Sequence, residues 1–499
     1  MFLAADSFED GHVERARTCV FGSGPAGMTL ARTLAERGED VLMIEAGGAE
    51  WEFESQELYQ GRVVGDPYFL LEDCRLRVFG GTSGHWGGYC RPLDAHDMAG
   101  TPGNPASRWP ISVADLQPYL AAASEILEIP GDFPEQQAGP DLVRTMYNYS
   151  PPVRFGDKYR DYCETSDRLR VCLNSALVNM LPGDDTGDDT GDEAGNESGQ
   201  ARIRAAEIVT ERGPGGAEGR TRWTVEAERF VICLGGIENS RMLLWINEQN
   251  GRALLPDHDL VGRYWMEHPN DSVGETVLMA DRAGLFVERP THFTLSGRYQ
   301  QDHALPNVVF EINEESYTKA KRLAADILCI APPLGRRLLE GIDKKLVCAA
   351  RVRCQWEQMP DPDNRVVLGG TPDRLGIPQV ELHWRNTPSE RRTIAASTLA
   401  LARAFAEQDI GRVKPFDWIV DDSLPFPDDE VIASYHHMGG TRMSADPAAG
   451  VVDPDLKVHG VANLYVGGSS VFPSAGYANP TLTIVQLALR LADHLRPAA

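Results

Sequence analysis

The sequence predicts an α/β fold, because strand and helix patterns alternate around glycine turns in the order of a parallel sheet. An apolar strand pattern over residues 17–24 enters a glycine turn, a helical pattern follows over 25–37, and a second strand pattern covers 40–45. This strand–helix–strand order is the unit from which parallel sheets are built. Two more strand patterns, at 220–234 and 463–470, lead into glycine pairs.

Length and charge narrow the class of protein. The 499 residues suggest two or three domains, and we expect them to be woven from separate segments because no repeat or clear linker divides the chain. With 42% hydrophobic and 24% charged residues, the composition is that of a globular protein. The net charge of −25 disfavours nucleic acid and anionic membranes as partners.

The cysteine pattern and the N-terminal residues indicate the cellular compartment in which the protein is expected. The nine cysteines are scattered without C-x-x-C spacing, so neither a disulfide framework nor a zinc or iron–sulfur site is predicted. The first ten residues lack the pattern of a signal peptide, and no apolar run is long enough to cross a bilayer. We expect a cytoplasmic protein. The alternative is a periplasmic protein exported with a partner that carries the signal.

The glycine turn has the spacing of a dinucleotide-binding motif. Gly22, Gly24 and Gly27 follow a strand and open a helix, where they allow a tight turn, a close backbone approach to a pyrophosphate and close helix–strand packing. The helix N-terminus would then face the phosphates. Glu45 ends the second strand, where an acid that binds ribose hydroxyls is expected. These residues fit FAD or NAD and disfavour NADP.

Two polar segments allow two interpretations each. Residues 183–199 carry seven acids and no base, which is typical of a solvated, disordered hairpin tip between strands at 171–180 and 201–210. A calcium loop is the alternative, although the spacing matches no EF-hand. The basic, amphipathic stretch 314–345 is interpreted as a solvated helix over a core, with a membrane surface or a partner as the alternative.

Several motifs, in one order along nearly the whole chain, resemble the glucose–methanol–choline (GMC) oxidoreductases. They are the glycine turn with Glu45, and segments 80–83, 233–241, 261–269, 359–366 and 434–483. The resemblance implies FAD in a Rossmann-like domain and a substrate domain built on an antiparallel sheet. We assign residues 1–95, 160–270 and 431–499 to the FAD-binding domain, and 96–159 and 271–430 to the substrate domain.

Within this family, segments 80–86, 437–441 and 476–481 most resemble the pyranose 2-oxidase branch, which includes bacterial glycoside 3-oxidases. The resemblance places the catalytic pair at His437 and Asn479. The chemistry suits these residue types, since hydride transfer to flavin N5 requires removal of the alcohol proton. A neutral imidazole can accept that proton, and an amide can bind the alcohol oxygen.

Each member of this pair has a structural alternative. Asn479 precedes Pro480 and an apolar helical run, so it could act as a helix N-cap with proline at the first helical position. His436 competes with His437, but adjacent residues of an extended segment point in opposite directions. The H-x-x-G-T spacing selects His437 as the base, and His436 is interpreted as a histidine packed behind the site.

The resemblance also implies further cofactor contacts. His85 lies where related enzymes carry a histidine covalently bound to flavin, and it would either form this bond or pack against the dimethylbenzene edge. Contacts near the flavin ring are implied for Thr82 and Ser83, and a close approach of the last strand to the cofactor for Gly468. The remaining positions are Val178, which with Leu177 would bracket the adenine, and Pro480 and Thr481, which begin the helix that faces the flavin.

From these residues we expect an FAD-dependent oxidoreductase that oxidises a secondary hydroxyl of a sugar or glycoside to a ketone, with His437 as general base. The acceptor of the electrons would be oxygen, a quinone or a cytochrome. The alternatives are a non-sugar alcohol as substrate, such as a sterol, an aryl alcohol or a secondary metabolite, and a flavoprotein lyase. A homo-oligomer, or a complex with a small accessory subunit, would fit the same sequence.

Overall fold

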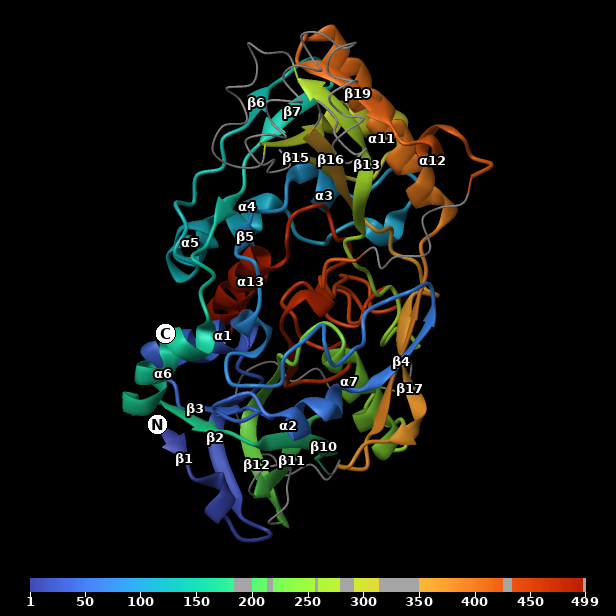
Figure 1. Cartoon of the computed structure of the whole chain (residues 1–499). Coiled ribbons are helices and arrows are strands. Elements are labelled where there is room, and N and C mark those ends of the chain that lie inside the picture. The colour runs from blue at the N-terminus through green and yellow to red at the C-terminus, as the bar shows by residue number, and fades with distance from the viewer. Residues whose placement is uncertain are drawn as a thin grey trace, which may run out of the picture.

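The computed structural model describes residues 1–183, 200–212, 219–255, 259–278, 291–313, 350–424 and 433–496. Two large sheets stand at opposite ends of the molecule, and C-terminal segments pass between them (Figure 1). Among the described residues, none of the helices combines the length and the apolar character that crossing a membrane would require. The predicted acidic tip, 183–199, and the amphipathic stretch, 314–345, lie almost entirely outside the described residues.

The first sheet has eight strands and confirms the predicted α/β unit. Its neighbours pair in the order β1-β9-β3-β2-β12-β11-β10, and β20 also pairs with β12. Pairing is parallel from β1 to β12 and antiparallel in the last two pairs. The strands are β1 (Phe2–Leu3), β2 (Val13–Phe21), β3 (Val41–Ile44), β9 (Leu169–Cys172), β10 (Ser175–Pro182), β11 (Ile203–Arg212), β12 (Gly219–Ile232) and β20 (Leu464–Val466).

Helices cover this sheet and connect the beginning of the chain to its end. Helix α1 (Pro25–Glu36) follows the glycine turn with proline at its start, where a missing backbone N–H costs nothing. Helix α13 (Thr481–His494) packs against α1. Arg37 joins the two helices, because its guanidinium donates to the carbonyl of Ala492 at 2.6 Å and pairs with Asp493 at 2.7 Å.

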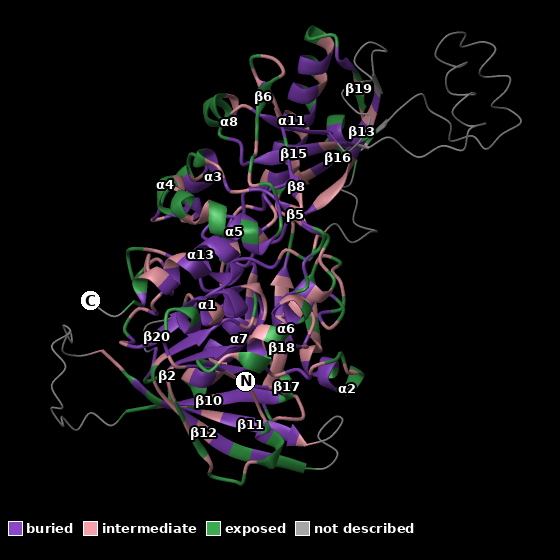
Figure 2. Cartoon of the chain, turned by 90° about the vertical axis from the view of Figure 1, so that its left-hand side faces the viewer, coloured by how far each residue is buried: buried purple, intermediate pink, exposed green. Residues whose placement is uncertain are grey.

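The second sheet has seven strands, all paired antiparallel, as the predicted substrate domain requires. Their order is β19-β13-β16-β15-β14-β7-β6. The strands are β6 (Gln136–Gln137), β7 (Leu142–Thr145), β13 (Asn270–Leu278), β14 (Thr291–Leu295), β15 (Val308–Asn313), β16 (Ala350–Trp356) and β19 (Gly411–Pro415). Helix α11 (Pro388–Glu407) shares an apolar core with this sheet through Ile394, Leu401 and Phe405. Buried residues fill the interior of both ends of the molecule (Figure 2).

Smaller elements complete the fold. A three-stranded sheet is formed by β17 (Arg365–Pro372), β18 (Pro378–Trp384) and β4 (Gly61–Gly65). After Ser112 the chain forms two short helices, because a 3-10 turn at Gln117–Tyr119, which contains Pro118, separates α4 (Val113–Leu116) from α5 (Leu120–Ile126). The proposed domain boundaries stay a prediction.

Candidate active site

A cavity of about 1450 Å³, counted with its open mouth, extends from the glycine turn to the paired histidines. Segments far apart in sequence line it: the turn 22–26, the loop 81–88, the strand end 233–237, the segment 434–437 and the start of α13. The predicted site residues on its wall are Gly22, Gly24, Glu45, Thr82, Ser83, His85, His437, Gly468, Asn479, Pro480 and Thr481. Gly27 and Val178 are not on this wall.

The glycine turn is shaped by close backbone approaches. Gly22 has φ +97°, and a Cβ there would lie 2.4 Å from the carbonyl oxygen of Cys233. A Cβ at Gly27 would lie 1.9 Å from the oxygen of Gly22, so the turn and the helix approach too closely here for a side chain. A Cβ at Gly24 would meet nothing within 4 Å, and its backbone borders the cavity. The start of α1 is therefore open to an anionic group.

Glu45 is buried directly after β3 and is tied to the turn. One carboxylate oxygen accepts hydrogen bonds from the backbone N–H of Ser23 at 2.9 Å and from its hydroxyl at 2.6 Å. The other oxygen accepts from the N–H of Gly47 at 2.7 Å. These three donors position the carboxylate on the cavity wall, where it retains lone pairs for ligand hydroxyls.

The loop with Thr82, Ser83 and His85 closes one side of the cavity. The Ser83 hydroxyl donates to the carbonyl of Gly80 at 2.7 Å and accepts from the N–H of Phe155 at 3.0 Å, so its bonds hold the loop in place. His85 is exposed, and the partial burial of its ring, followed by the charge of Arg154, lowers its pKa below the ordinary value. A neutral His85 side chain on the cavity wall is compatible with both predicted roles.

Val178 and Leu177 have different surroundings. Val178 is buried in β10, and its carbonyl accepts a hydrogen bond from the Trp245 indole at 2.9 Å. Leu177 lines a smaller cleft, which shares Ala46, Tyr59 and Leu234 with the main cavity. Both residues lie where the pairing of β10 with β11 is irregular, because the register shifts between Leu177 and Asn179. The bracketing of adenine by these two residues stays a prediction.

His437 is almost fully buried, with 9% of its surface exposed. Its ring lies beside Tyr68 and Trp265, with ring centroids 6.3 and 5.8 Å away, and its Nε2 has no hydrogen-bond partner among the described residues. Burial, then the charges of Arg75 and His85, lowers its pKa to about 3. The ring is therefore neutral at pH 7, as a proton acceptor must be, but it is a weaker base than free imidazole.

His436 also lines the cavity, and it is more exposed than His437. Its Nδ1 lies 3.0 Å from Nδ1 of His268, and its backbone N–H donates to the carboxylate of Glu267 at 2.7 Å. Burial is the main reason that its pKa falls well below the ordinary value. The rings of His436 and His437 have different neighbours, as expected for adjacent residues of an extended segment.

Asn479 is partly exposed on the cavity wall, and its side-chain oxygen accepts a hydrogen bond from the Gln355 amide at 3.4 Å. Helix α13 begins at Thr481 without a side-chain cap, so Asn479 does not have the capping role that was the alternative. Its amide is therefore available to a ligand.

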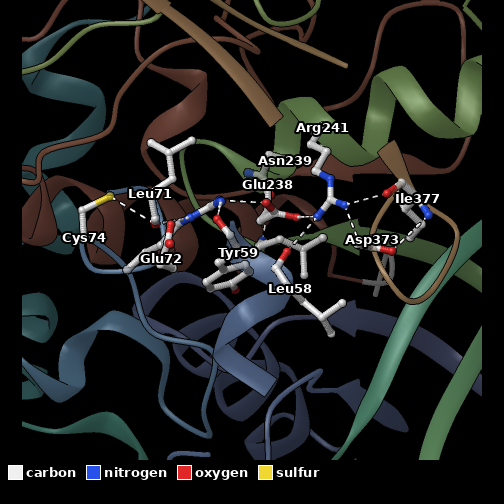
Figure 3. Close-up of polar contacts among 12 residues, drawn as sticks. Leu58, Tyr59, Leu71, Glu72, Cys74, Glu238, Asn239, Arg241, Asp373 and Ile377 are labelled. Atoms are coloured by element: carbon white, nitrogen blue, oxygen red, sulfur yellow. Dashed lines mark hydrogen bonds and ion pairs between the residues drawn. The ribbon is translucent and has the colours of Figure 1, made fainter. Parts of the chain in front are cut away.

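Sequence reasoning gave no role to a buried ion-pair network that reaches the cavity wall. Glu238 pairs with Arg241 at 3.2 Å, and Arg241 pairs with Asp373 at 2.6 Å (Figure 3). Arg75 pairs with Glu238 at 2.7 Å. Arg75 also donates to the carbonyl of Tyr59 at 3.0 Å. The sequence feature that could have indicated this network is the presence of charged residues within glycine-rich and apolar segments.

These residues fit a dinucleotide cofactor. The turn offers backbone and a helix start to a pyrophosphate, Glu45 offers acceptors to a ribose, and the space continues to the histidines. His437, whose buried Nε2 has no partner among the described residues, lines the far end of this space.

Comparison with known proteins agrees with this geometry. Residues 360–488 match a family model described as GMC oxidoreductase. The chain is 28% identical to the fructose dehydrogenase large subunit of Gluconobacter japonicus, over 54% of this chain and about half (47%) of that protein. It is 26% identical to 2-methyl-1,2-propanediol dehydrogenase of Mycolicibacterium austroafricanum, over 95% of this chain and 94% of the other. A shorter match, over 25% of this chain and 22% of the other, is 35% identical to C-glycoside 3-oxidase of Microbacterium trichothecenolyticum.

A solved structure shares the fold. Pyridoxine 4-oxidase from Mesorbium loti superposes with a TM-score of 0.55 at 16% identity, over 96% of this chain and 99% of the other. In this fold the cavity places a site that fits a dinucleotide beside a buried histidine. The family-model match to residues 360–488 and the dehydrogenase and oxidase relatives support an alcohol oxidoreductase that is similar to the GMC oxidoreductases, which are FAD flavoproteins.

Proposed function

We propose that this chain is an FAD-dependent enzyme that oxidises a secondary hydroxyl of a sugar or glycoside to a ketone, with His437 as general base. One observation carries the proposal: His437, neutral and with an unpartnered Nε2, lines the same cavity as Asn479 and the glycine turn. The matches to a fructose dehydrogenase subunit and a C-glycoside 3-oxidase favour a sugar.

The residues that would hold FAD are the glycine turn at its pyrophosphate and Glu45 at its ribose. When bound, FAD supplies the acceptor for the hydride that leaves the alcohol carbon. Nε2 of His437 takes the hydroxyl proton, and the Asn479 amide donates to the alcohol oxygen and orients the carbon. Tyr68 and Trp265 pack beside the imidazole and exclude water from it. The start of α13, at Pro480 and Thr481, adds a positive helix end near the site.

A non-sugar alcohol is the second candidate. The match to 2-methyl-1,2-propanediol dehydrogenase covers 95% of this chain, so a small aliphatic diol fits as well. The electron acceptor is oxygen, a quinone or a cytochrome in either case.

The visible spectrum of the purified protein, recorded without oxygen, tests the proposal. Bleaching of a flavin band by a glycoside would support it, whereas bleaching only by non-sugar alcohols would favour the second candidate. A fully folded protein without flavin absorption would contradict both. Admission of air then tests oxygen as acceptor, and acid precipitation tests His85: a yellow pellet indicates a covalent bond and a yellow supernatant a noncovalent one.

The base is tested by His437→Ala, with His383→Ala as the control. His383 lies on β18, away from the cavity wall, and pairs with Glu381. We expect His437→Ala to keep its flavin and to lose at least a hundredfold in the rate of bleaching, in line with the contribution of general-base catalysis. Full turnover in this variant would exclude His437 as the base.

A further inference from the structure

His268, which is fully buried, and His436, which is partly exposed, form a pair across two facing segments. The segments pair antiparallel at Met266 and Met438, whose backbones exchange hydrogen bonds of 2.7 and 3.0 Å. His268 and His436 are the next directly opposed residues on the same side, so their rings meet at the 3.0 Å Nδ1–Nδ1 contact. Glu267 holds both backbones, because one carboxylate oxygen accepts from the N–H groups of both histidines at 2.9 and 2.7 Å.

The surrounding acceptors decide which ring nitrogens carry protons. His268 Nε2 lies 3.2 Å from the carbonyl oxygen of Ala475, which can only accept, so Nε2 carries a hydrogen. Burial lowers the pKa of His268 to about 4, so the ring is neutral and its Nδ1 is a bare acceptor. His436 Nδ1 must then donate to it, and since His436 is also neutral, its Nε2 is bare.

The free edge of His436 borders the cavity. Among the described residues, Nε2 of His436 makes no hydrogen bond. This atom is not buried, so it is open to solvent. The side chain shares the cavity wall with Asn479 and His437. An unprotonated ring nitrogen that faces the substrate favours a substrate with a hydrogen-bond donor at that position. A ligand without the donor leaves the nitrogen unpaired and binds more weakly.

We propose that His436 determines substrate specificity: its Nε2 accepts a hydrogen bond from a second hydroxyl of the substrate, beside the hydroxyl that His437 deprotonates. His268 is the positioning residue that keeps His436 in this acceptor state. The preferred substrates are therefore vicinal diols and polyols rather than isolated alcohols. This inference rests on the proposed alcohol oxidation.

The test compares trans-1,2-cyclohexanediol with cyclohexanol, and methyl β-D-glucopyranoside with its monodeoxy analogues, by the rate of flavin bleaching without oxygen. The wild type is expected to prefer the compound with the second hydroxyl by about tenfold or more. His436→Phe should reduce that preference to within about threefold, because the variant cannot accept the second hydrogen bond. His383→Phe is the matched histidine control and should leave the preference unchanged.

Two variants of His268 test the positioning role. His268→Asn places an amide oxygen where Nδ1 stood, so His436 keeps its donor–acceptor state and the preference should stay within about twofold of wild type. His268→Phe removes that acceptor and should relax the preference toward that of His436→Phe. A merely structural role would affect both His268 variants alike.

Three results would overturn the inference. They are an unchanged preference in His436→Phe, equal preferences in the two His268 variants, and the loss of all bleaching in His436→Phe with an intact flavin spectrum, which would make His436 the base. Failure of the proposed function is distinguishable, because the wild-type flavin would then resist every alcohol before any variant is made.

Discussion

Buried carboxyl groups lie on both sides of the cavity, and their pKa values are shifted in opposite directions. On the side of the eight-stranded sheet, Glu238 is buried with Arg241 and Arg75, which lower its pKa below the ordinary value against the effect of burial. On the side of the antiparallel sheet, burial raises the pKa of Glu357 to about 7 and that of Asp97 well above its ordinary value. With equal burial, the charge of the partner decides whether a carboxyl is ionised.

The second group supports the loop that leads to Asn479. Asn307 joins its two carboxyls, because its side-chain amide donates to Asp97 at 2.8 Å and its backbone N–H donates to Glu357 at 2.9 Å. Gly476 rests on Asp97, since a Cβ there would lie 2.6 Å from the carboxyl carbon. The first group supports the opposite wall through Arg75.

The largest expected effect comes from breaking the paired side. Glu238→Leu leaves Arg75 and Arg241 buried without their shared partner, so we expect the free energy of unfolding to fall by about 3–5 kcal/mol. Urea titration measures it. The control is Glu381→Leu, which breaks the more exposed pair with Arg62 and should cost less than about 1 kcal/mol. Equal losses in the two variants would mean that burial of the pairs does not matter.

A smaller effect, visible as a pH dependence, is expected on the other side. The folded protein holds a proton on Glu357 up to about pH 7, whereas the ordinary pKa is 4.5. The unfolded chain therefore releases this proton first, and the free energy of unfolding falls as pH rises from about 4.5 to 7. Glu357→Gln removes this contribution, on the order of 2–3 kcal/mol.

Urea titrations at pH 5 and pH 8 measure this difference. The variant should resemble the wild type at pH 5 and should be the more stable protein at pH 8. The mutation Asp94→Asn sharpens the result, because the charge of Asp94 helps to raise the pKa of Glu357 and its removal should reduce the pH dependence. Parallel pH profiles of wild type and Glu357→Gln would show that Glu357 is ionised in the folded protein.

The smallest effect on the free energy of unfolding is expected at Glu267, whose hydrogen-bond partners are neutral. Burial raises the pKa of Glu267 to about 7, against the hydrogen bond that it accepts from Tyr68 and two backbone N–H groups. Tyr68→Phe removes one donor and should cost about 1–2 kcal/mol at neutral pH, measured by urea titration. Tyr299→Phe, on the partly exposed helix α8 (Gly297–His303), is the control and should change little. No loss in Tyr68→Phe would mean that the hydroxyl bond adds nothing.

The two sides also differ in how far the sequence predicts them. The glycine turn, β2–α1–β3 and the position of Glu45 could be predicted because their constraints are local: a positive φ at Gly22 and a helix start at Pro25. The antiparallel sheet came only from the family resemblance. Its clusters depend on strand pairing that spacing does not encode, as with Asn307 and Glu357.

The histidine site was predicted only in part. The family resemblance pointed to His437 and Asn479, and both line the cavity. The low pKa of His437 could not be predicted, because it comes from burial among residues as distant in sequence as Tyr68 and Trp265. The pairing of His436 with His268 also needs the Met266–Met438 bridge, which forms only in the folded chain.

The pairing of β20 with β12 and the packing of α13 on α1 have a consequence for folding. The eight-stranded sheet is completed by a segment made more than 400 residues after its central strand β2. Closing so long a loop is slow relative to local structure formation, so we expect this docking to limit the folding rate. Until residues 464–494 arrive, the apolar edge of β12 stays uncovered and prone to aggregation. Chaperone demand should therefore be greatest late in synthesis.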